Sequence, residues 1–220
     1  MGTTAAGAGV RWVGAQRTVL AGDLRAHISL ERLAGLPHLY ALGPVAGLRG
    51  EITVVDGRPY VSRVEDGRIV VDRTLRHEAA FLVWAQIARW YDLDIPDTVR
   101  DGRDLEDFVV ERTRDSGMAI ETPFAFAVTG VAPRVSLHIL DRRDDRAHSR
   151  ERHEEIKVPF AIERCAVEVV GFCSQRHAGI FVPAGRRTHM HVCSRDGAVA
   201  GHVDDLRLGP GMTLRLPAAS

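Results

Sequence analysis

Apolar and polar residues alternate along residues 49–73, a pattern typical of β-strands that bury one face. The apolar positions of this stretch are Ile52, Val54, Val55, Tyr60, Val61, Val64, Ile69 and Val71. Two Asp-Gly pairs, at 56–57 and 66–67, interrupt the pattern and suit the positive φ angles of tight hairpin turns. The pattern therefore predicts a three-stranded β-meander.

Other segments predict a mixture of short helices and strands. Residues 16–22 are consistent with a short strand and residues 28–36 with a short helix. Residues 77–93 are apolar on nearly every side, so a buried strand and a buried helix both fit. Helical spacing begins after a cap at Asp104 and ends at Gly117, and strand character returns over residues 122–140.

The remaining chain contains a charged segment followed by many short strands. Residues 141–155 are almost entirely charged and predict a solvated loop or arm, with His148 and His153 at the surface. Residues 160–216 contain four short strand patterns. We therefore expect an α+β fold that is mostly β, with mixed or antiparallel sheets in two closely packed lobes.

The chain length fits one domain. We expect a flexible tail over residues 1–10 and a single domain over residues 11–220. The domain is predicted to divide into an N-terminal sheet lobe, about 11–130, and a C-terminal metal-binding β lobe, about 131–220.

Composition narrows the classes of partner. Lys+Arg and Asp+Glu both number 29, so the chain lacks the basic excess that nucleic-acid binding needs. The N-terminus has no secretory pattern, and no apolar run is long enough to predict a membrane span. Three cysteines, an odd and small number, favour free thiols. We expect a cytoplasmic protein that binds neither nucleic acid nor membranes.

Three of the 10 histidines lie around one Asp-Gly pair in "THMHVCSRDGAVAGHVDD", residues 188–205. A type I′ hairpin with Asp196 and Gly197 as its two-residue turn would place His191 directly opposite His202. His189 lies two residues before His191 and so shares its face. Opposed residues have Cβ atoms about 4.5–5.5 Å apart, so the three imidazoles are expected to converge.

Converging imidazoles are typical of a divalent metal site. Three protein ligands leave a coordination position open, which indicates a catalytic rather than a structural ion. Zinc is the expected metal, with nickel, cobalt, iron and manganese as alternatives. Cys193 shares the same face as a weaker candidate ligand, and Asp204 falls opposite His189 on that face as a candidate acceptor for a ring N–H.

The sequence resembles the acetolactate decarboxylases in three blocks that together span most of residues 40–205. They are "GPVAGLRGEITVVDGRPY", "TPFAFAVTG" and "VVGFCSQRHAGIFVPAGRRTHMHVCSRDGAVAGHVDD". The third is specific to the family, the first moderately so, and the second is weak alone. The resemblance implies a zinc enzyme whose metal is held by His189, His191 and His202, with Glu51 as a catalytic carboxylate and a homodimeric assembly.

The chain departs from the family pattern around the substrate. Pro44 stands where the family has Thr, and His138 stands where it has an Arg that holds the substrate carboxylate. Arg134 and Arg142 lie nearby in sequence. The chain ends at Ser220, so a second Glu from the family's longer C-terminal tail is expected to have no counterpart.

The resemblance implies a metal-dependent decarboxylase of a small 2-hydroxy-3-oxo acid, converting acetolactate or a close analogue to acetoin and CO₂. The metal would hold the electrons left by CO₂ as an enediolate. Glu51 would deliver the proton, and His138 or a nearby Arg would hold the carboxylate.

Three alternatives stay open. A lyase or cyclase could use the same chemistry on a different biosynthetic keto acid. A cupin-like metal oxygenase would need a redox metal, and its acid after the His-x-His pair is only faintly matched. A non-catalytic binding domain would use the metal structurally, which three ligands argue against.

Overall fold

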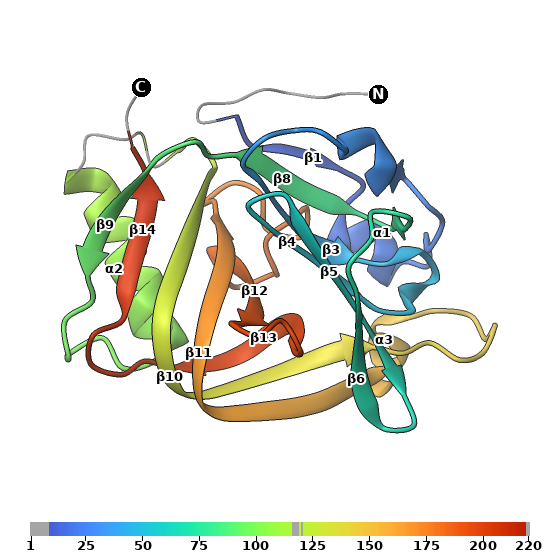
Figure 1. Cartoon of the computed structure of the whole chain (residues 1–220). Coiled ribbons are helices and arrows are strands. Elements are labelled where there is room, and N and C mark those ends of the chain that lie inside the picture. Colours follow the sequence, from blue (N-terminus) through green and yellow to red (C-terminus); the bar gives the residue numbers. More distant parts are fainter. Residues whose placement is uncertain (1–8, 116–118, 120, 219–220) are drawn as a thin grey trace.

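The fold is built mainly from antiparallel β-strands, as the sequence predicts (Figure 1). A computed structural model describes residues 9–115, 119 and 121–218. It contains two six-stranded sheets and a two-stranded sheet. A core cluster that includes Leu42 and Val83 from the first large sheet and Ala125 and Phe172 from the second joins the two.

The first sheet is assembled from the N-terminal part of the chain, with strand order β1-β8-β3-β4-β5-β6. The strands are β1 (Arg11–Val13), β3 (Leu39–Pro44), β4 (Glu51–Val55), β5 (Arg58–Glu65), β6 (Arg68–Asp72) and β8 (Leu82–Gln86). The small sheet pairs β2 (Ile28–Ser29) with β7 (Glu78–Ala79).

The second sheet has the order β11-β12-β13-β10-β14-β9, with β10 also pairing with β11. Its strands are β9 (Trp90–Asp94), β10 (Phe124–Leu140), β11 (Lys157–Cys173), β12 (Thr188–Ser194), β13 (Ala200–Arg207) and β14 (Thr213–Pro217). The 17-residue strands β10 and β11 run side by side along the lower part of Figure 1.

The predicted meander is confirmed as β4, β5 and β6. Asp56 and Gly57 have φ angles of 47° and 77°, and Asp66 and Gly67 have 49° and 73°. Positive φ at both central residues is what a type I′ turn requires, so Asp-Gly is used here as expected. The ambiguous 77–93 stretch forms the strands β7, β8 and β9.

The prediction of a strand over 16–22 is wrong, because this segment forms the helix α1 (Gln16–Leu20). The first N–H groups of a helix need acceptors outside it. Here the N–H groups of Gln16 and Arg17 each donate over 2.8 Å, to the carbonyls of Ile180 and Gly179. A contact with a distant loop therefore decides the local structure.

The predicted helix over 28–36 is shorter than expected. Only η1 (Leu30–Leu33), a 3₁₀ helix, forms after a cap at Ser29, while Ile28 and Ser29 join β2. A second 3₁₀ segment, η2 (Ala46–Leu48), follows β3.

The helix predicted from Asp104 is α2 (Gly102–Asp115), which begins two residues earlier. Asp101 Oδ1 accepts the N–H groups of Arg103 and Asp104, so Asp101 rather than Asp104 acts as the cap. The predicted end at Gly117 lies outside the described residues. Buried Leu105 and Val109 join α2 to the core of the second sheet.

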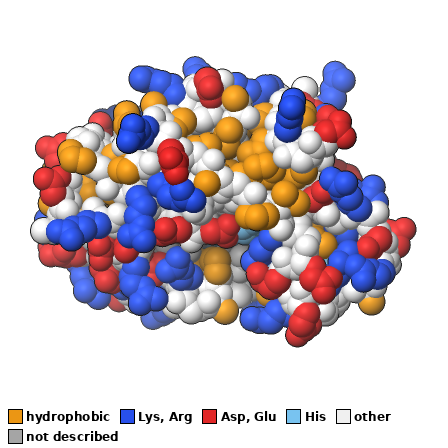
Figure 2. Space-filling model, turned by 90° about the horizontal axis from the view of Figure 1, so that it is seen from below, with side chains coloured by type: hydrophobic (Ala, Val, Ile, Leu, Met, Phe, Trp, Pro, Cys, Tyr) orange, Lys and Arg blue, Asp and Glu red, His pale blue; other side chains and the backbone are white. Residues whose placement is uncertain are grey.

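The tail, the lobe boundary and the charged surface give little information about function. Residues 1–8 of the predicted tail lie outside the described residues, and Val10 is already fully buried. The division into lobes near residue 130 stays a prediction. Within the described ranges, no helix combines the length and apolarity needed to span a bilayer. Acidic and basic side chains are interspersed on the face seen from below (Figure 2).

We predict that Gly171→Ala destabilises the fold. Gly171 of β11 pairs with Phe126 of β10, and a Cβ at 171 would lie 2.2 Å from the Phe126 ring. Forcing a methyl group into a packed core costs about 1–3 kcal/mol of unfolding free energy. Urea unfolding measures this change.

Gly102→Ala is the matched control, because its Cβ would meet no atom closer than 3.8 Å. We expect it to be neutral or stabilising. Equal losses in the two variants would contradict the packing argument.

Candidate metal site and adjoining cavity

The β12–β13 hairpin has the register that the sequence predicts, with His191 paired to His202. Its turn differs from the prediction. Asp196 does not have the positive φ that a type I′ turn requires, whereas Gly197 has φ 67°. Ser194 N donates to Val199 O over 2.8 Å, closing a four-residue loop centred on the same point. The longer loop therefore preserves the register.

The three hairpin histidines lie together. His189 Nε2 is 3.0 Å from His202 Nδ1, and the ring centroids of His189 and His191 are 5.2 Å apart. The three side chains form one of two groups among the described residues that could hold a metal ion. Two nitrogens bound to one tetrahedral ion at about 2.0–2.1 Å would lie roughly 3.4 Å apart. The observed separation is close to that spacing.

Two of the three rings are oriented by a contact on their other side. His189 Nδ1 donates to the carbonyl of Phe181 over 2.7 Å, which leaves Nε2 as an acceptor. His191 Nδ1 lies 3.1 Å from Thr53 Oγ1 on β4, and His191 Nε2 is buried without a hydrogen-bond partner. A lone pair in that position is what a cation would bind.

Burial keeps these imidazoles neutral. Desolvation lowers the pKa of His189 to about 4 and holds the pKa values of His191 and His202 well below the usual range. Neutral imidazole is the form that binds metals, so the site is poised for a divalent cation at neutral pH.

Glu51 reaches the same site from the first sheet. It begins β4, its side chain is 3% exposed, and its Oε2 lies 3.7 Å from His191 Nε2. Gly50 before it has φ 144°, and a Cβ there would lie 2.3 Å from the carbonyl oxygen of Ser62. Glycine at 50 therefore lets β4 begin close against β5.

Desolvation raises the pKa of Glu51 to about 8, against the opposing effect of a backbone hydrogen bond from Leu140. Without a bound cation, Glu51 is therefore mostly protonated at pH 7.

His138 joins the cluster from β10, where it pairs with His202. Their ring centroids are 4.5 Å apart, and His138 Nδ1 bonds to Asp204 Oδ1 at 2.7 Å. Asp204 thus accepts from the ring of His138, whereas the acceptor for the His189 ring is the Phe181 carbonyl. The β12–β13 pairing ends at His191 and His202, so the strands do not hold His189 across from Asp204.

A cavity of about 490 Å³ opens beside the cluster. Its lining includes Glu51, His138, His189 and His202. Parts of α1 and the 178–185 loop complete the wall, together with Pro44, which pairs with Glu51. The site therefore combines metal-ligating nitrogens, a carboxyl group and space for a small molecule.

Three other sequence candidates lie away from this cavity. Cys193 is buried in a core cluster, its Sγ donates to Ser194 O, and burial raises its pKa to about 12. Arg134 forms an ion pair with Glu163, and Arg142 donates to the carbonyl of Arg146.

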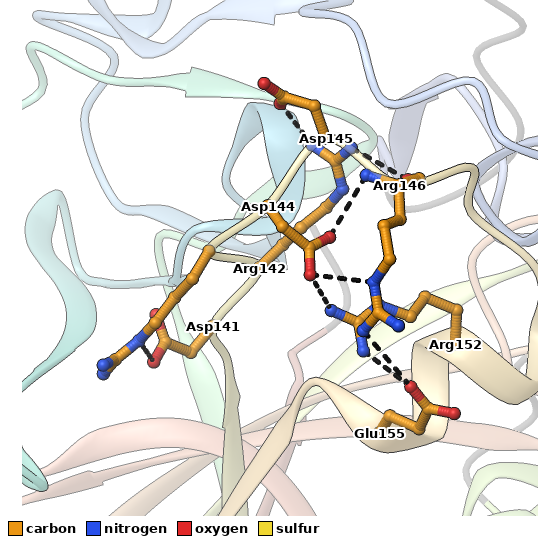
Figure 3. Close-up of polar contacts among 8 residues, drawn as sticks. Asp141, Arg142, Asp144, Asp145, Arg146, Arg152 and Glu155 are labelled. Atoms are coloured by element: carbon orange, nitrogen blue, oxygen red, sulfur yellow. Dashed lines mark hydrogen bonds and ion pairs between the residues drawn. The ribbon is translucent and has the colours of Figure 1, made fainter.

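The charged segment 141–156 is more ordered than the sequence predicts. Ser149 caps the short helix α3 (Arg150–Glu155). Figure 3 shows Asp144 between two arginines. Asp144 Oδ2 lies 3.0 Å from Arg146 Nε and 2.6 Å from Arg152 Nη2. We call residues 141–156 the arm. The ion-pair network links its loop to α3, which lies at the cavity rim.

The arm contributes to the cavity wall, which sequence reasoning missed. His153 is half-buried, desolvation lowers its pKa to about 4, and it lines the cavity with Arg150 and Glu154. Acidic and basic residues spaced three apart, such as Arg152 and Glu155, are the sequence signal that could have predicted this helix.

Comparison with known proteins gives one family. The family model described as alpha-acetolactate decarboxylase matches residues 19–218. No curated protein matches the sequence.

Solved structures share the fold at low identity. Alpha-acetolactate decarboxylase from Bacillus subtilis strain 168 has 17% identity and a TM-score of 0.74, covering 94% of this chain and 85% of that one. The enzyme from Bacillus subtilis subspecies spizizenii has 17% identity and a TM-score of 0.75, covering 95% and 85%. A Staphylococcus aureus protein described as similar to this decarboxylase has 14% identity and a TM-score of 0.73, covering 93% and 83%.

We predict that Glu51→Gln stabilises the metal-free protein at pH 8. A carboxyl group whose folded pKa is raised stabilises the fold below its unfolded pKa, and that contribution is lost as pH rises through the folded value. For Glu51 the window runs from 4.5 to about 8. The gain at pH 8 is on the order of 4 kcal/mol and shrinks to under about 1 kcal/mol at pH 5.

Urea unfolding of chelator-treated protein at both pH values measures this difference. Glu65→Gln, at an exposed carboxyl 52% accessible on β5, is the control and should change little. A pH-independent effect of Glu51→Gln would rule out a buried, protonated carboxyl group.

Proposed function

Because the chain belongs to the alpha-acetolactate decarboxylase family and is therefore a carboxy-lyase, we propose that it is a divalent-metal-dependent decarboxylase of a 2-hydroxy-3-oxo acid. Acetolactate is the proposed substrate, with acetoin and CO₂ as products. One observation carries the proposal. The buried histidine cluster and the buried carboxyl group of Glu51 adjoin one cavity large enough for such a molecule.

His189, His191 and His202 would hold the metal. The buried Nε2 of His191 has no protein partner, and the Phe181 carbonyl fixes the tautomer that leaves His189 Nε2 free. Three neutral nitrogen ligands suit zinc, and nickel, cobalt, iron or manganese would also accept them. A bound ion would supply Lewis-acid chemistry, withdrawing electron density from the substrate ketone and so favouring the loss of CO₂.

Glu51 is proposed to carry the proton that replaces the carboxylate. It lies at the end of the cavity nearest His191, and its hydrogen bond from the Leu140 backbone fixes its orientation. Decarboxylation leaves an electron pair on carbon, and a proton must reach that carbon to form acetoin. A buried carboxyl group beside the reacting atoms is suited to deliver it.

His138 is proposed to accept a hydrogen bond from the substrate hydroxyl group. Asp204 accepts from His138 Nδ1, which leaves Nε2 available. The His138–Asp204 pair also holds the ring against His202, so it supports the neighbouring ligand. This is a polar contact rather than the guanidinium contact of the family pattern.

A second candidate is a lyase or cyclase that uses the same metal chemistry on another biosynthetic keto acid. Pro44 and His138 favour it, because both line the cavity where the family pattern has other residues. Family membership sets the cupin-like alternative aside. The cytoplasmic location and the homodimer expected from the sequence stay predictions.

We predict that purified protein forms acetoin from racemic acetolactate, that chelation abolishes this activity, and that zinc restores it. His191→Ala should lower bound metal from about one equivalent to near zero, because one of three ligands is lost. It should also lower kcat/KM by at least about 100-fold, since loss of a residue that only hydrogen-bonds to a metal ligand already costs about 10–100-fold in metal affinity or activity. Elemental analysis and an acetoin assay measure the two quantities.

His38→Ala is the control, because His38 is 49% exposed and pairs with Asp56. Metal content and activity should match the unmodified protein. A folded, metal-loaded protein that yields no acetoin would exclude acetolactate as substrate. Metal content unchanged in His191→Ala would exclude the ligand set.

A further inference from the structure

The cavity beside the histidine cluster contains one partly buried cation. Arg17, Arg150 and Lys157 are the described cations that line it, and both arginines are exposed at its rim. Lys157, the only lysine in the sequence, has a side chain that is 27% exposed. Burial strengthens the interaction of a charge with an ionic ligand, so Lys157 is the cation best placed to bind an anion there.

The strand register directs Lys157 toward the reacting end of the cavity. Lys157 begins β11 and pairs with Leu140 of β10. Leu140 also lines the cavity, and its backbone N–H binds the Glu51 carboxyl group. Directly paired residues project to the same face of a sheet. Leu140 therefore places both residues at the same wall of the cavity, Lys157 through strand pairing and Glu51 through a hydrogen bond.

The cavity wall brings Lys157 together with the residues of the proposed site. Lys157, Glu51 and His202 all line this one cavity. A substrate held against Glu51 and His202 would therefore share the cavity with the ammonium group.

Glu154 is the ion-pair partner of Lys157 in this structure. Its two carboxylate oxygens lie 2.8 and 2.7 Å from Lys157 Nζ. Glu154 lies in the last turn of α3 on the arm, and its side chain is 63% exposed. The Glu154 carboxylate is the exposed end of this pair, so water can solvate it when an incoming carboxylate takes its place on Lys157.

We propose that Lys157 binds the carboxylate of the substrate and that Glu154 is the counter-ion which the substrate displaces. The assignment rests on the proposed function, because it needs a substrate that enters as an anion. The ammonium group holds the carboxylate until the carbon–carbon bond breaks, with the electron pair left on the substrate carbon. The departing CO₂ is uncharged, so Glu154 can return to Lys157.

Other cations fit less well. Arg134 and Arg142 have their own partners and do not line the cavity. His138 binds Asp204, whose negative charge opposes binding of a second carboxylate at the same ring.

Binding of two unreactive probes to the zinc-loaded protein tests the assignment. The first is 2-hydroxy-2-methylpropanoate, which has the carboxylate but no ketone to support decarboxylation. The second is acetoin, which is neutral. Lys157→Met should weaken binding of the acid by about 10- to 100-fold and change acetoin binding less than about twofold, since only the acid uses the ion pair.

Glu154→Gln should have the opposite effect. Removing the competing carboxylate should tighten binding of the acid by about 3- to 10-fold without changing acetoin binding. Lys157→Arg should retain most of the affinity for the acid. Arg150→Gln, which removes a charge from the exposed rim, is the matched control and should change the affinity for the acid less than about threefold.

Thermal unfolding of every variant checks that the chain folds. Equal loss of both probes in Lys157→Met would mean that the lysine only supports the wall, and weaker acid binding in Glu154→Gln would mean that Glu154 orients the lysine. Either result overturns the assignment. If the unmodified protein makes acetoin but Lys157→Met binds the acid normally, only this inference fails. If the unmodified protein binds neither probe, the proposed function fails with it.

Discussion

The buried imidazoles of His189 and His191 and the partly buried one of His202 can be accommodated in this fold only as neutral rings. Burial holds the pKa of His189 near 4 and keeps those of His191 and His202 well below their usual range. Neutral rings present lone pairs, and buried lone pairs need partners. The Phe181 carbonyl satisfies one side of His189, while the Nε2 of His191 has no protein partner. The proposed metal would satisfy that requirement, and the surrounding polar contacts keep the rings aimed at it.

The site needs both large sheets. β12 and β13 supply the histidines, whereas β4 supplies Thr53, which orients His191, and Glu51, which lies beside it. The core cluster shared by the sheets therefore holds the two halves of the site together. The arm adds part of the cavity rim through an ion-pair network, so the rim and the buried end of the cavity are built by different parts of the chain.

Local patterns predicted much of this arrangement from sequence. The meander and the pairing of His191 with His202 follow from alternation and Asp-Gly spacing, because strand geometry repeats every two residues. The turn at 196–197 was mispredicted, yet the register survives because the longer loop is centred on the same point. Glu51 was identified through a family resemblance, since its environment comes from the other sheet.

What the sequence could not predict depends on contacts between distant segments. α1 is helical because its N–H groups reach the 179–180 carbonyls. The acceptor for His189 is Phe181, from a loop without a recognisable pattern. Lys157 joins the cavity because β10 and β11 pair over their full length, which brings its position opposite Leu140.

The most direct test is a crystal structure of the zinc-loaded protein with anomalous scattering recorded at the zinc edge. We expect one strong peak about 2.0–2.1 Å from His189 Nε2, His191 Nε2 and His202 Nδ1, open toward the cavity. A peak held instead by His138, His202 and Asp204, the other group that could bind a metal, would contradict the account. So would a fully loaded crystal with no peak at the hairpin.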